Sequence, residues 1–506
     1  MRVKSKLEAN QKPGATNMGT PISRRTLLQR TIILAGGAML ETTFLGCSVN
    51  DHTKPATAVA YPLQFPIGFL WGAATSAYQI EGAARTDGRG VSVWDTFSHT
   101  PGRTVDGATG DVADDHYHRY ATDFDLLQSL GVQSYRFSIA WPRILPDGAG
   151  AVNQRGVDFY RRLVDELLKR SIRPMVTLFH WDTPQALQDL GGWENREVAY
   201  RFAEYADVMY QALGDVATSW LTLNEPKTVT TVGYISGTHA PGIQDPARAY
   251  VALHHMLLGH GLATQAFRAR FGRGGAHQIG ASLNLSPVYP ADHNAGTAEA
   301  VTLQDGFENR LYLDPILKGS YPADVVAALS EVWPSDAVIR PGDLGVIGTQ
   351  IDQLGVNYYN PLTVTAGPQI VSGVYPTTVA SWENIYPQGL YDTLMRLTHD
   401  YPGIPLAITE NGAPYQDTLD ANGAIDDPQR LAYIHDHLVA AHRAVQAGAP
   451  LRAYHVWSLL DNFEWNEGYS QRWGIVYVDY ATQRRYPKRS ALWYREVIRQ
   501  HGVVAP

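Results

Sequence analysis

Short apolar or aromatic runs alternate with longer amphipathic segments from residue 69 to the end of the chain. Several short runs are apolar throughout, as strands covered on both faces are, and they are rich in β-branched and aromatic residues. The longer segments repeat apolar residues at helical spacing; one such face contains Val157, Tyr160, Leu163, Val164, Leu167 and Leu168. The pattern predicts eight strands, at residues 70–75, 134–139, 174–179, 218–223, 278–283, 353–357, 406–409 and 453–458.

Strands that alternate with helices in this way form parallel sheets. Eight such units without a repeating sequence period predict an α/β protein with a single (β/α)8 TIM barrel and long βα loops over residues 61–506. The active site of such a barrel lies at the carboxyl ends of its strands. Residues 361–389 have no clear period, and we expect them to form a loop region over the barrel mouth.

The first 60 residues differ in charge from the rest of the 506-residue chain. They contain eight Lys or Arg against three Asp or Glu, whereas residues 61–506 contain 33 basic and 46 acidic residues, a net charge of −13. Arg24 and Arg25 precede an apolar run of about ten residues, an order that resembles a twin-arginine export signal. That run is about half the length of a membrane-spanning helix. We therefore expect an export signal over residues 1–47 and a periplasmic or extracellular protein.

Cys47 is the only cysteine, so an internal disulfide is excluded. It follows Phe44-Leu45-Gly46, which resembles a bacterial lipobox with Phe in place of the usual Leu. Two outcomes stay open: lipidation of Cys47, or loss of this cysteine with the signal, for example by cleavage after Ala60. Residues 48–60 are polar without an apolar period, which is typical of a linker. Contact with a membrane is expected only through a lipid anchor at Cys47.

The composition limits the classes of partner and chemistry. An acidic body argues against a nucleic-acid partner, because such binding is driven by a basic face. With 44% hydrophobic and 18% charged residues, the chain has the material for a large core. It contains no phosphate-binding loop of the G-x-x-x-x-G-K-[ST] type and no zincin motif. We therefore expect no cofactor and no metal.

Two glutamates follow predicted strands in a way that marks candidate chemistry. The fourth strand runs into Thr-Leu-Asn-Glu-Pro, where Pro226 is expected to hold Glu225 in extended geometry and to end the strand. The seventh runs into Ile-Thr-Glu-Asn-Gly, where the Asn-Gly turn signal follows Glu410. Each glutamate alone is typical of a solvated loop or a salt bridge. The fourth and seventh strands of a barrel face each other, so two carboxylates there can flank one bond.

A carboxylate pair of this kind is what retaining glycoside hydrolysis requires. One carboxylic acid protonates the leaving oxygen, and a second carboxylate about 5–5.5 Å away attacks the anomeric carbon. Other motifs follow the predicted strands: FLWGAATSAYQIEGA at 69–83, YRFSIAWPR at 135–143, LFHWD at 178–182, GVNYY at 355–359 and WSLLDNFEW at 457–465. Together with the two glutamate motifs, they resemble glycoside hydrolase family 1, the β-glucosidase type, over residues 61–498.

The resemblance implies a retaining β-glycosidase, and it favours a β-glucosidase that acts on terminal β-D-glucosyl groups of β-glucosides or short oligosaccharides, as in cellulose degradation. It implies that Glu410 is the nucleophile and Glu225 the acid/base. Their environments must then separate their pKa values. Arg136 would favour the charged form of Glu410, and Tyr359 would hydrogen-bond it. The peptide bond between Trp457 and Ser458 is expected to be cis.

The same resemblance implies a sugar-binding site. Asn224 would hold the sugar 2-hydroxyl and Asn357 would lie nearby, while Trp457 would form the floor under the ring. The other sugar hydroxyls would be held by Gln79, His180, Glu464 and Trp465. Considered alone, a buried histidine or tryptophan is more often core filling. Trp473 stands where the family more commonly has Phe, which is expected to narrow the space near the sugar 6-position.

Three questions stay open at this point. The motifs do not choose among glucose, galactose and fucose as the preferred sugar. A carbohydrate-binding protein without turnover is an alternative, although it would typically lack one of the two carboxylates. A transferase that passes the sugar to a second sugar rather than to water uses the same intermediate.

Overall fold

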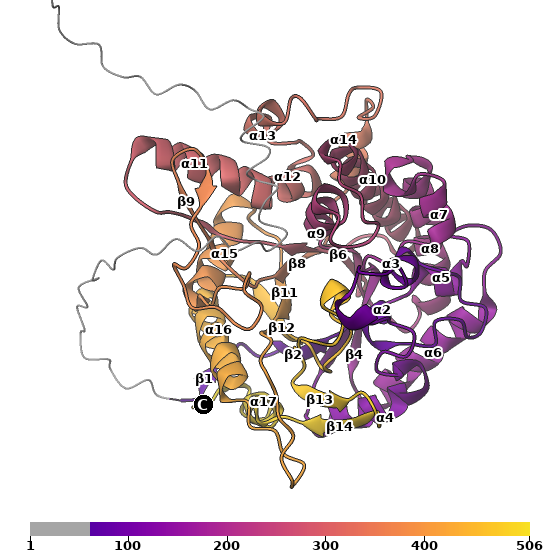
Figure 1. Ribbon diagram of the computed structural model, residues 1–506, viewed down its shortest axis with the longest axis vertical. Helices are drawn as coiled ribbons and strands as arrows, with labels where there is room; N and C mark the ends of the chain where they lie inside the picture. Colours follow the sequence, from indigo (N-terminus) through magenta and orange to yellow (C-terminus); the bar gives the residue numbers. More distant parts are fainter. Residues whose placement is uncertain (1–60) are drawn as a thin grey trace, which may run out of the picture.

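The computed structural model describes residues 61–506 (Figure 1). The predicted export signal, Cys47 and the linker at 48–60 lie outside the described residues. Within residues 61–506, no helix combines the length and the apolar composition that a membrane span requires.

Eight parallel strands form a closed barrel at the centre of the molecule (Figure 1). Around the barrel the strands follow the order β11-β12-β2-β3-β4-β5-β6-β8. Almost every residue of these strands is buried, as expected where helices cover a barrel whose interior is filled by side chains. All eight predicted strands are confirmed: β2 (Leu70–Ala74), β3 (Ser134–Ser138), β4 (Arg173–Phe179), β5 (Ser219–Asn224), β6 (Gln278–Asn284), β8 (Gln353–Asn357), β11 (Leu406–Asn411) and β12 (Leu451–Trp457).

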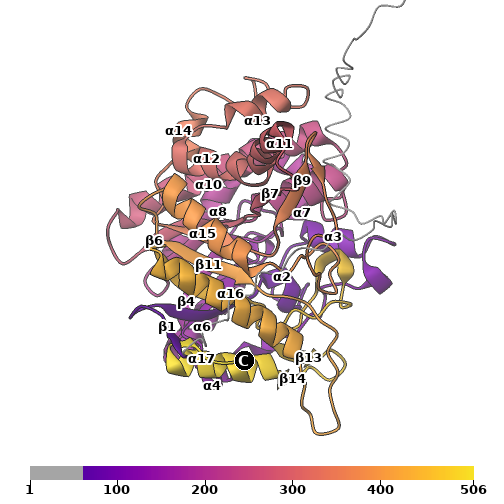
Figure 2. The same cartoon turned by 90° about the vertical axis from the view of Figure 1, so that its left-hand side faces the viewer.

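Long helices surround the barrel (Figures 1 and 2). In α6 (Gln154–Lys169) the predicted apolar face is confirmed for Val157, Tyr160 and Leu163, which are buried, whereas Leu168 is exposed. Three of the long helices begin with a proline, at a position where no amide hydrogen is needed, and the Asp245 side chain caps one of them, α10 (Pro246–Phe271). The long helices are α4 (His116–Ser129), α6 (Gln154–Lys169), α8 (Glu197–Leu213), α10 (Pro246–Phe271), α11 (Ala295–Asp305), α15 (Pro387–Asp400), α16 (Pro428–Gln446) and α17 (Arg489–Gln500).

Short elements fill the connections. Helical segments are α2 (Ala77–Ile80), α3 (Val93–Ser98), η1 (Val105–Gly107), α5 (Trp141–Ile144), α7 (Gln185–Asp189), η2 (Gly192–Glu194), α9 (Pro226–Thr228), η3 (Val229–Ser236), η4 (Gly306–Arg310), α12 (Leu311–Lys318), α13 (Ala323–Ala328), α14 (Asp343–Ile347) and η5 (Trp465–Glu467). Strands outside the barrel are β1 (Leu63–Gln64), β7 (Val288–Pro290), β9 (Leu362–Thr365), β10 (Gln369–Ile370), β13 (Val476–Asp479), β14 (Arg484–Pro487) and β15 (Gly502–Val503).

The two ends of the described chain lie together. β1 pairs antiparallel with β15, and both views show β1 beside the C-terminus (Figures 1 and 2). The Phe65 ring packs on Trp71, at the start of β2, with ring centroids 5.0 Å apart. This pair therefore lies near the amino ends of the barrel strands, away from the carboxyl ends where the site is expected.

The prediction that residues 361–389 form only a loop is partly wrong. The segment contains β9 and β10, which join β7 in a three-stranded sheet, and α15 begins at Pro387. The strands were missed because they are two to four residues long and show no alternation of buried and exposed residues: the two central residues of β9 are both buried, and β10 has only two residues. The sheet anchors a loop that brings Ala380 and Trp382 to the barrel mouth, beside Tyr359.

Candidate active site

Glu225 lies directly after β5, and its backbone differs from the prediction. It is not extended: its φ is +45° and its ψ is +64°, the left-handed region. Its amide donates to the carbonyl of Ser282 in β6, 2.9 Å away, while Pro226 already begins α9. The chain must pass from strand to helix at this one residue, and that requirement outweighs the preference of a residue before proline. The sharp turn places the Glu225 carboxyl, which is 4% exposed, at the barrel mouth.

Glu410 is held inside β11 and pairs in register with Asn357 of β8. The strand continues through Asn411, one residue further than the turn signal indicated. Gly412 then lies so close to Trp457 that a Cβ atom would be 1.6 Å from its carbonyl oxygen, so only glycine fits there. Arg136 of β3 donates to Oε1 of Glu410 at 2.5 Å, and the Tyr359 hydroxyl donates to Oε2 at 2.7 Å.

A chain of hydrogen bonds connects the two glutamates. Arg136, which bonds Glu410, also donates from Nη2 to Oδ1 of Asn224 at 2.6 Å. The Asn357 amide donates to the same Asn224 oxygen at 3.1 Å and to Oε1 of Glu225 at 2.6 Å. Five residues are therefore brought together as the motifs predicted: Arg136 in the middle of β3, and the others at the carboxyl ends of β5, β8 and β11.

Burial dominates the electrostatics of Glu410. Removal of the carboxyl from water raises its pKa to about 7, and the charge of Glu225 acts in the same direction. The guanidinium of Arg136 and the Tyr359 hydroxyl lower the pKa, as expected, but they do not outweigh burial. The arginine thus keeps the pKa of a deeply buried carboxyl near neutrality, where both protonation states are accessible.

His180, at the end of β4, presents a hydrogen-bond donor that has no protein partner. Nδ2 of Asn224 lies 3.1 Å from Nε2 of His180, and because an amide nitrogen only donates, Nε2 accepts. Burial holds the pKa of His180 well below its ordinary value, so the ring is neutral and its proton lies on Nδ1. Nδ1 is buried without a partner in the described protein. A sugar hydroxyl would satisfy it.

Gln79 and Glu464 meet from opposite ends of the chain. Nε2 of Gln79, on α2, donates to Oε2 of Glu464 at 3.3 Å and to Oδ1 of Asn462 at 3.0 Å. Burial raises the pKa of Glu464 to about 8, and the negative charge of Glu410 adds to the effect. The site therefore contains a further carboxyl that is largely neutral near pH 7 and can donate or accept a hydrogen bond.

Aromatic rings line the remaining sides. Trp457 and Trp465 lie nearly parallel to the His180 ring, with centroids 5.8 and 5.9 Å away. The Trp457–Ser458 peptide bond is cis, as the resemblance implied. Trp473 is buried in one cluster with Tyr359 and Trp457, so the substitution at this position lies among the predicted sugar-binding residues.

Four residues of the site were not selected from the sequence. Trp382 stacks on Trp473 at 5.9 Å and is 49% exposed. Trp181 donates from its indole to the Asn224 carbonyl at 3.0 Å and packs on Trp465. Asn462 fixes Gln79, and Thr228 donates to Glu225 at 2.7 Å. Trp181 belongs to the motif at 178–182 and Asn462 to the motif at 457–465, so their positions in the sequence pointed to the site. Trp382 lies in residues 361–389, where no apolar period and no motif marked it.

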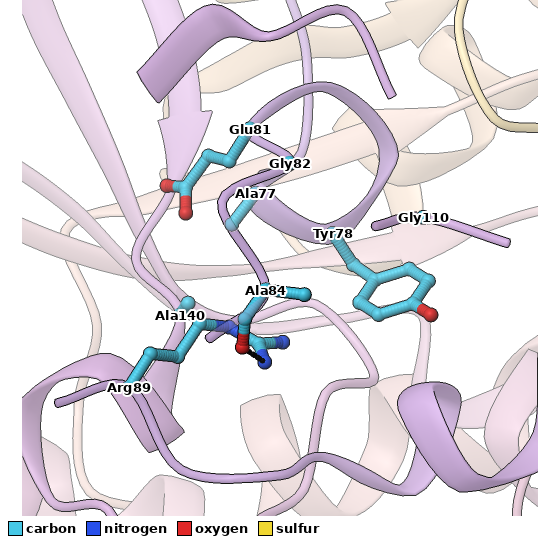
Figure 3. Close-up of a pocket in the computed structure, with 8 residues that line it drawn as sticks. All are labelled: Ala77, Tyr78, Glu81, Gly82, Ala84, Arg89, Gly110 and Ala140. Atoms are coloured by element: carbon cyan, nitrogen blue, oxygen red, sulfur yellow. Dashed lines mark hydrogen bonds between the residues drawn. The ribbon is translucent and has the colours of Figure 1, made fainter. Parts of the chain in front are cut away.

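A small cavity beside α2 is separate from this site (Figure 3). Its volume is about 10 Å³, room for about one water molecule and too small for a sugar. Arg89 donates to the Ala84 carbonyl at 2.9 Å across it. The lining residues are Ala77, Tyr78, Glu81, Gly82, Ala84, Arg89, Gly110 and Ala140. Glu81, one of the lining residues, is paired with Arg143 at 2.8 Å, and this ion pair anchors the end of the helix that carries Gln79.

Among residues 61–506, no group of three or more His, Cys, Asp or Glu side chains is arranged to hold a metal ion. Two buried carboxyls and a set of aromatic and amide side chains thus meet at the mouth of a closed parallel barrel, an arrangement that fits the cleavage of a glycosidic bond.

Comparisons with known proteins agree with the family that the motifs resemble. The model of glycosyl hydrolase family 1 matches residues 61–503. The chain is 50% identical to thermostable beta-glucosidase B of Thermobispora bispora over 90% of this chain and 94% of that protein. The structure matches a family 1 β-glucosidase from Thermotoga maritima with a TM-score of 0.84, at 45% identity, over 88% of this chain and all of the other. A complex of the Thermotoga maritima enzyme with glucoimidazole also matches, with a TM-score of 0.84 at 45% identity, over 87% of this chain and all of the other.

The chain belongs to glycosyl hydrolase family 1. It is a retaining glycoside hydrolase, as the motif resemblance indicated, and the alternative of a binding protein without turnover is set aside.

Proposed function

We propose that this protein is a β-glucosidase that releases terminal, non-reducing β-D-glucosyl groups from β-glucosides or short oligosaccharides. The observation that carries the proposal is the hydrogen-bonded chain from Glu410 through Arg136, Asn224 and Asn357 to Glu225. The glucosidase names of the most similar relatives and the match to a glucoimidazole complex support glucose as the sugar.

In the first step, a carboxylate oxygen of Glu410 attacks the anomeric carbon. Glu225 gives its proton to the glycosidic oxygen as the bond between that oxygen and the anomeric carbon breaks, and the aglycone leaves as an alcohol. Arg136 and Tyr359 hold the two Glu410 oxygens, so the attacking group is oriented before the substrate arrives. The product of this step is a covalent glucosyl ester of Glu410.

In the second step, the ionised Glu225 removes a proton from water, and the water oxygen bonds to the anomeric carbon. The ester bond to Glu410 breaks and the carboxylate is restored. The Tyr359 hydroxyl can donate to the oxygen that regains negative charge, which favours the release of the sugar. Two inversions at one carbon leave the β configuration unchanged.

The sugar hydroxyls would meet four kinds of group. Nδ1 of His180 is a free donor, Gln79 and Glu464 form a hydrogen-bonded pair, and Trp457 offers a ring face. Asn224, whose amide and oxygen are both engaged in the network beside the nucleophile, would meet the sugar 2-hydroxyl. A sugar acceptor in place of water remains the rival outcome of the second step.

We also propose export through the twin-arginine-like segment at residues 1–47, with lipidation at Cys47 as an anchor to the membrane and 48–60 as a tether. The described chain begins beside β15, near the amino ends of the barrel strands. A tether joined at Tyr61 would leave the barrel mouth free to meet soluble glucosides. Short glucans from cellulose degradation are the class of substrate that fits such a location.

Proton NMR on the protein from Tyr61 onward, mixed with an aryl β-glucoside, tests the reaction. We expect the β-anomer of glucose to appear first, with the α-anomer growing later by mutarotation. Early α-anomer would overturn the two-step mechanism. Turnover of the β-galactoside in place of the β-glucoside would overturn the sugar assignment and leave the mechanism standing.

A further inference from the structure

Thr228, the last residue of α9, directs its hydroxyl at the proposed acid/base. Its Oγ1 donates to Oε2 of Glu225 at 2.7 Å. The neighbouring threonines of the same helical turn behave differently, because Thr230 and Thr231 donate to the backbone carbonyls of Pro226 and Lys227. Those contacts are the usual local bonds of threonine in a helix. Thr228 instead bonds a side chain three residues before it.

The two oxygens of Glu225 meet donors of different kinds. Oε1 accepts from the Asn357 amide at 2.6 Å, and an amide nitrogen can donate but cannot accept. A proton on Oε1 would therefore face another hydrogen, so the transferable proton belongs on Oε2. A hydroxyl, unlike an amide, can donate to Oε2 when that oxygen is ionised and turn away when it carries the proton.

This contact favours one of the two states that Glu225 must adopt. In the first step Oε2 carries the proton, which has to point at the glycosidic oxygen. The hydrogen bond from the Thr228 hydroxyl to this neutral oxygen is then weak. In the second step Oε2 is ionised, and a donor to a charged oxygen is worth more than one to a neutral oxygen. The Thr228 hydroxyl therefore stabilises the base form of the residue.

Other titratable groups act on Glu225 from the surrounding elements. Glu410 of β11, Tyr359 after β8 and Glu464 before η5 interact with it electrostatically. Arg136 of β3 and His180 after β4 are hydrogen-bonded to Asn224, and the Asn357 amide connects Asn224 to Glu225. On its own element, Lys227 is paired with Glu308 of η4 at 3.0 Å. None of these groups depends on the Thr228 hydroxyl.

We propose that Thr228 is a positioning residue that donates to Oε2 of Glu225, the oxygen to which the Asn357 amide confines the transferable proton, and thereby favours the ionised form needed for the second step. The inference rests on the proposed acid/base role of Glu225. It deepens that role by naming the group that adjusts one carboxyl for two opposite tasks.

The test compares Thr228→Val, which keeps the shape and removes the hydroxyl, with Thr228→Ser, which keeps the hydroxyl. With Thr228→Val, the basic limb of the kcat/KM profile should move about one pH unit higher, because the acid keeps its proton longer. For an aryl β-glucoside with a good leaving group, kcat and KM should both fall about three- to tenfold, because the slower second step lets the glucosyl-enzyme accumulate. Thr228→Ser should restore both values.

Thr231→Val is the matched control, since its hydroxyl bonds only a backbone carbonyl. It should leave the pH limb and the split between kcat and KM unchanged. In a Glu225→Ala background, Thr228→Val should no longer change the profile. Equal shifts from Thr228→Val and Thr231→Val, or no shift in a protein that hydrolyses the glucoside, would overturn the role of Thr228. Absence of hydrolysis in the parent protein would instead overturn the proposed function.

Discussion

Glu410 and Glu225 lie at the carboxyl ends of two barrel strands, but their surroundings differ in kind. Glu410 accepts from a guanidinium and a phenol, while Glu225 accepts from an amide and an aliphatic hydroxyl. A fixed positive charge stabilises the ionised form of a carboxylate that must attack. Neutral donors stabilise that form less, so the second carboxyl can both release and accept a proton. Because both side chains are buried and chemically identical, the neighbours of each glutamate determine which one acts as the nucleophile and which one as the acid/base.

The largest expected effect comes from removal of the attacking oxygen. Glu410→Gln should lower turnover of an aryl β-glucoside by at least about 10⁴-fold, because an amide cannot form the covalent intermediate. Steady-state rates measure the loss, and circular dichroism checks that the barrel is retained. Intact turnover in this variant would show that Glu410 is not the nucleophile.

Glu225→Ala should have an effect that depends on the leaving group. For a poor leaving group, which needs the proton, the rate should fall about 10²- to 10⁴-fold. For a good leaving group the first step should persist, and added azide should restore turnover by replacing the water that no longer has a base. Mass spectrometry identifies the expected β-glucosyl azide. An α-azide, or equal losses for both leaving groups, would contradict the contrast between the two carboxyls.

The smallest effect concerns stability and tests Glu464. Its pKa, raised to about 8 in the folded protein, exceeds the ordinary value of 4.5, so the folded state holds the proton more tightly than the unfolded state. The free energy of unfolding therefore loses a contribution as pH rises from about 4.5 through about 8. Glu464→Gln should raise the midpoint of thermal unfolding by about 2–4 °C more at pH 9 than at pH 5.

The control for that measurement is Glu299→Gln, on the exposed side of α11, which should move the midpoint equally at both pH values. The same gain at pH 5 and pH 9 for Glu464→Gln would show that its carboxyl is ionised in the folded protein.

Strong local patterns accounted for most of the fold. The eight barrel strands are short apolar runs bounded by turns, and each was found. β9 and β10 carry no such pattern; β9 forms on the edge of β7, a strand far earlier in the chain, and β10 forms on β9. Glu225 shows the same limit in its backbone. The proline rule favours an extended residue, but the bond to Ser282 and the start of α9 require φ +45°.

The site could be predicted where its residues stand in motifs. Glu225, Glu410, Asn224 and Tyr359 lie in or directly after the ends of strands that a barrel must bring together, so their proximity follows from the order of elements alone. Thr228 could not be selected in this way, because nothing in the sequence distinguishes it from Thr230 and Thr231. Only the orientation of one helical turn decides which hydroxyl reaches the carboxyl.

By itself, then, the sequence determined the barrel, the family and the pair of glutamates, because apolar periodicity and local turn signals act over a few residues. The tertiary structure decided the protonation chemistry. Burial raises the pKa of Glu410 to about 7 although Arg136 lies beside it. That balance depends on how much water eight strands and their loops exclude, and the free energy of a charge depends on everything that surrounds it.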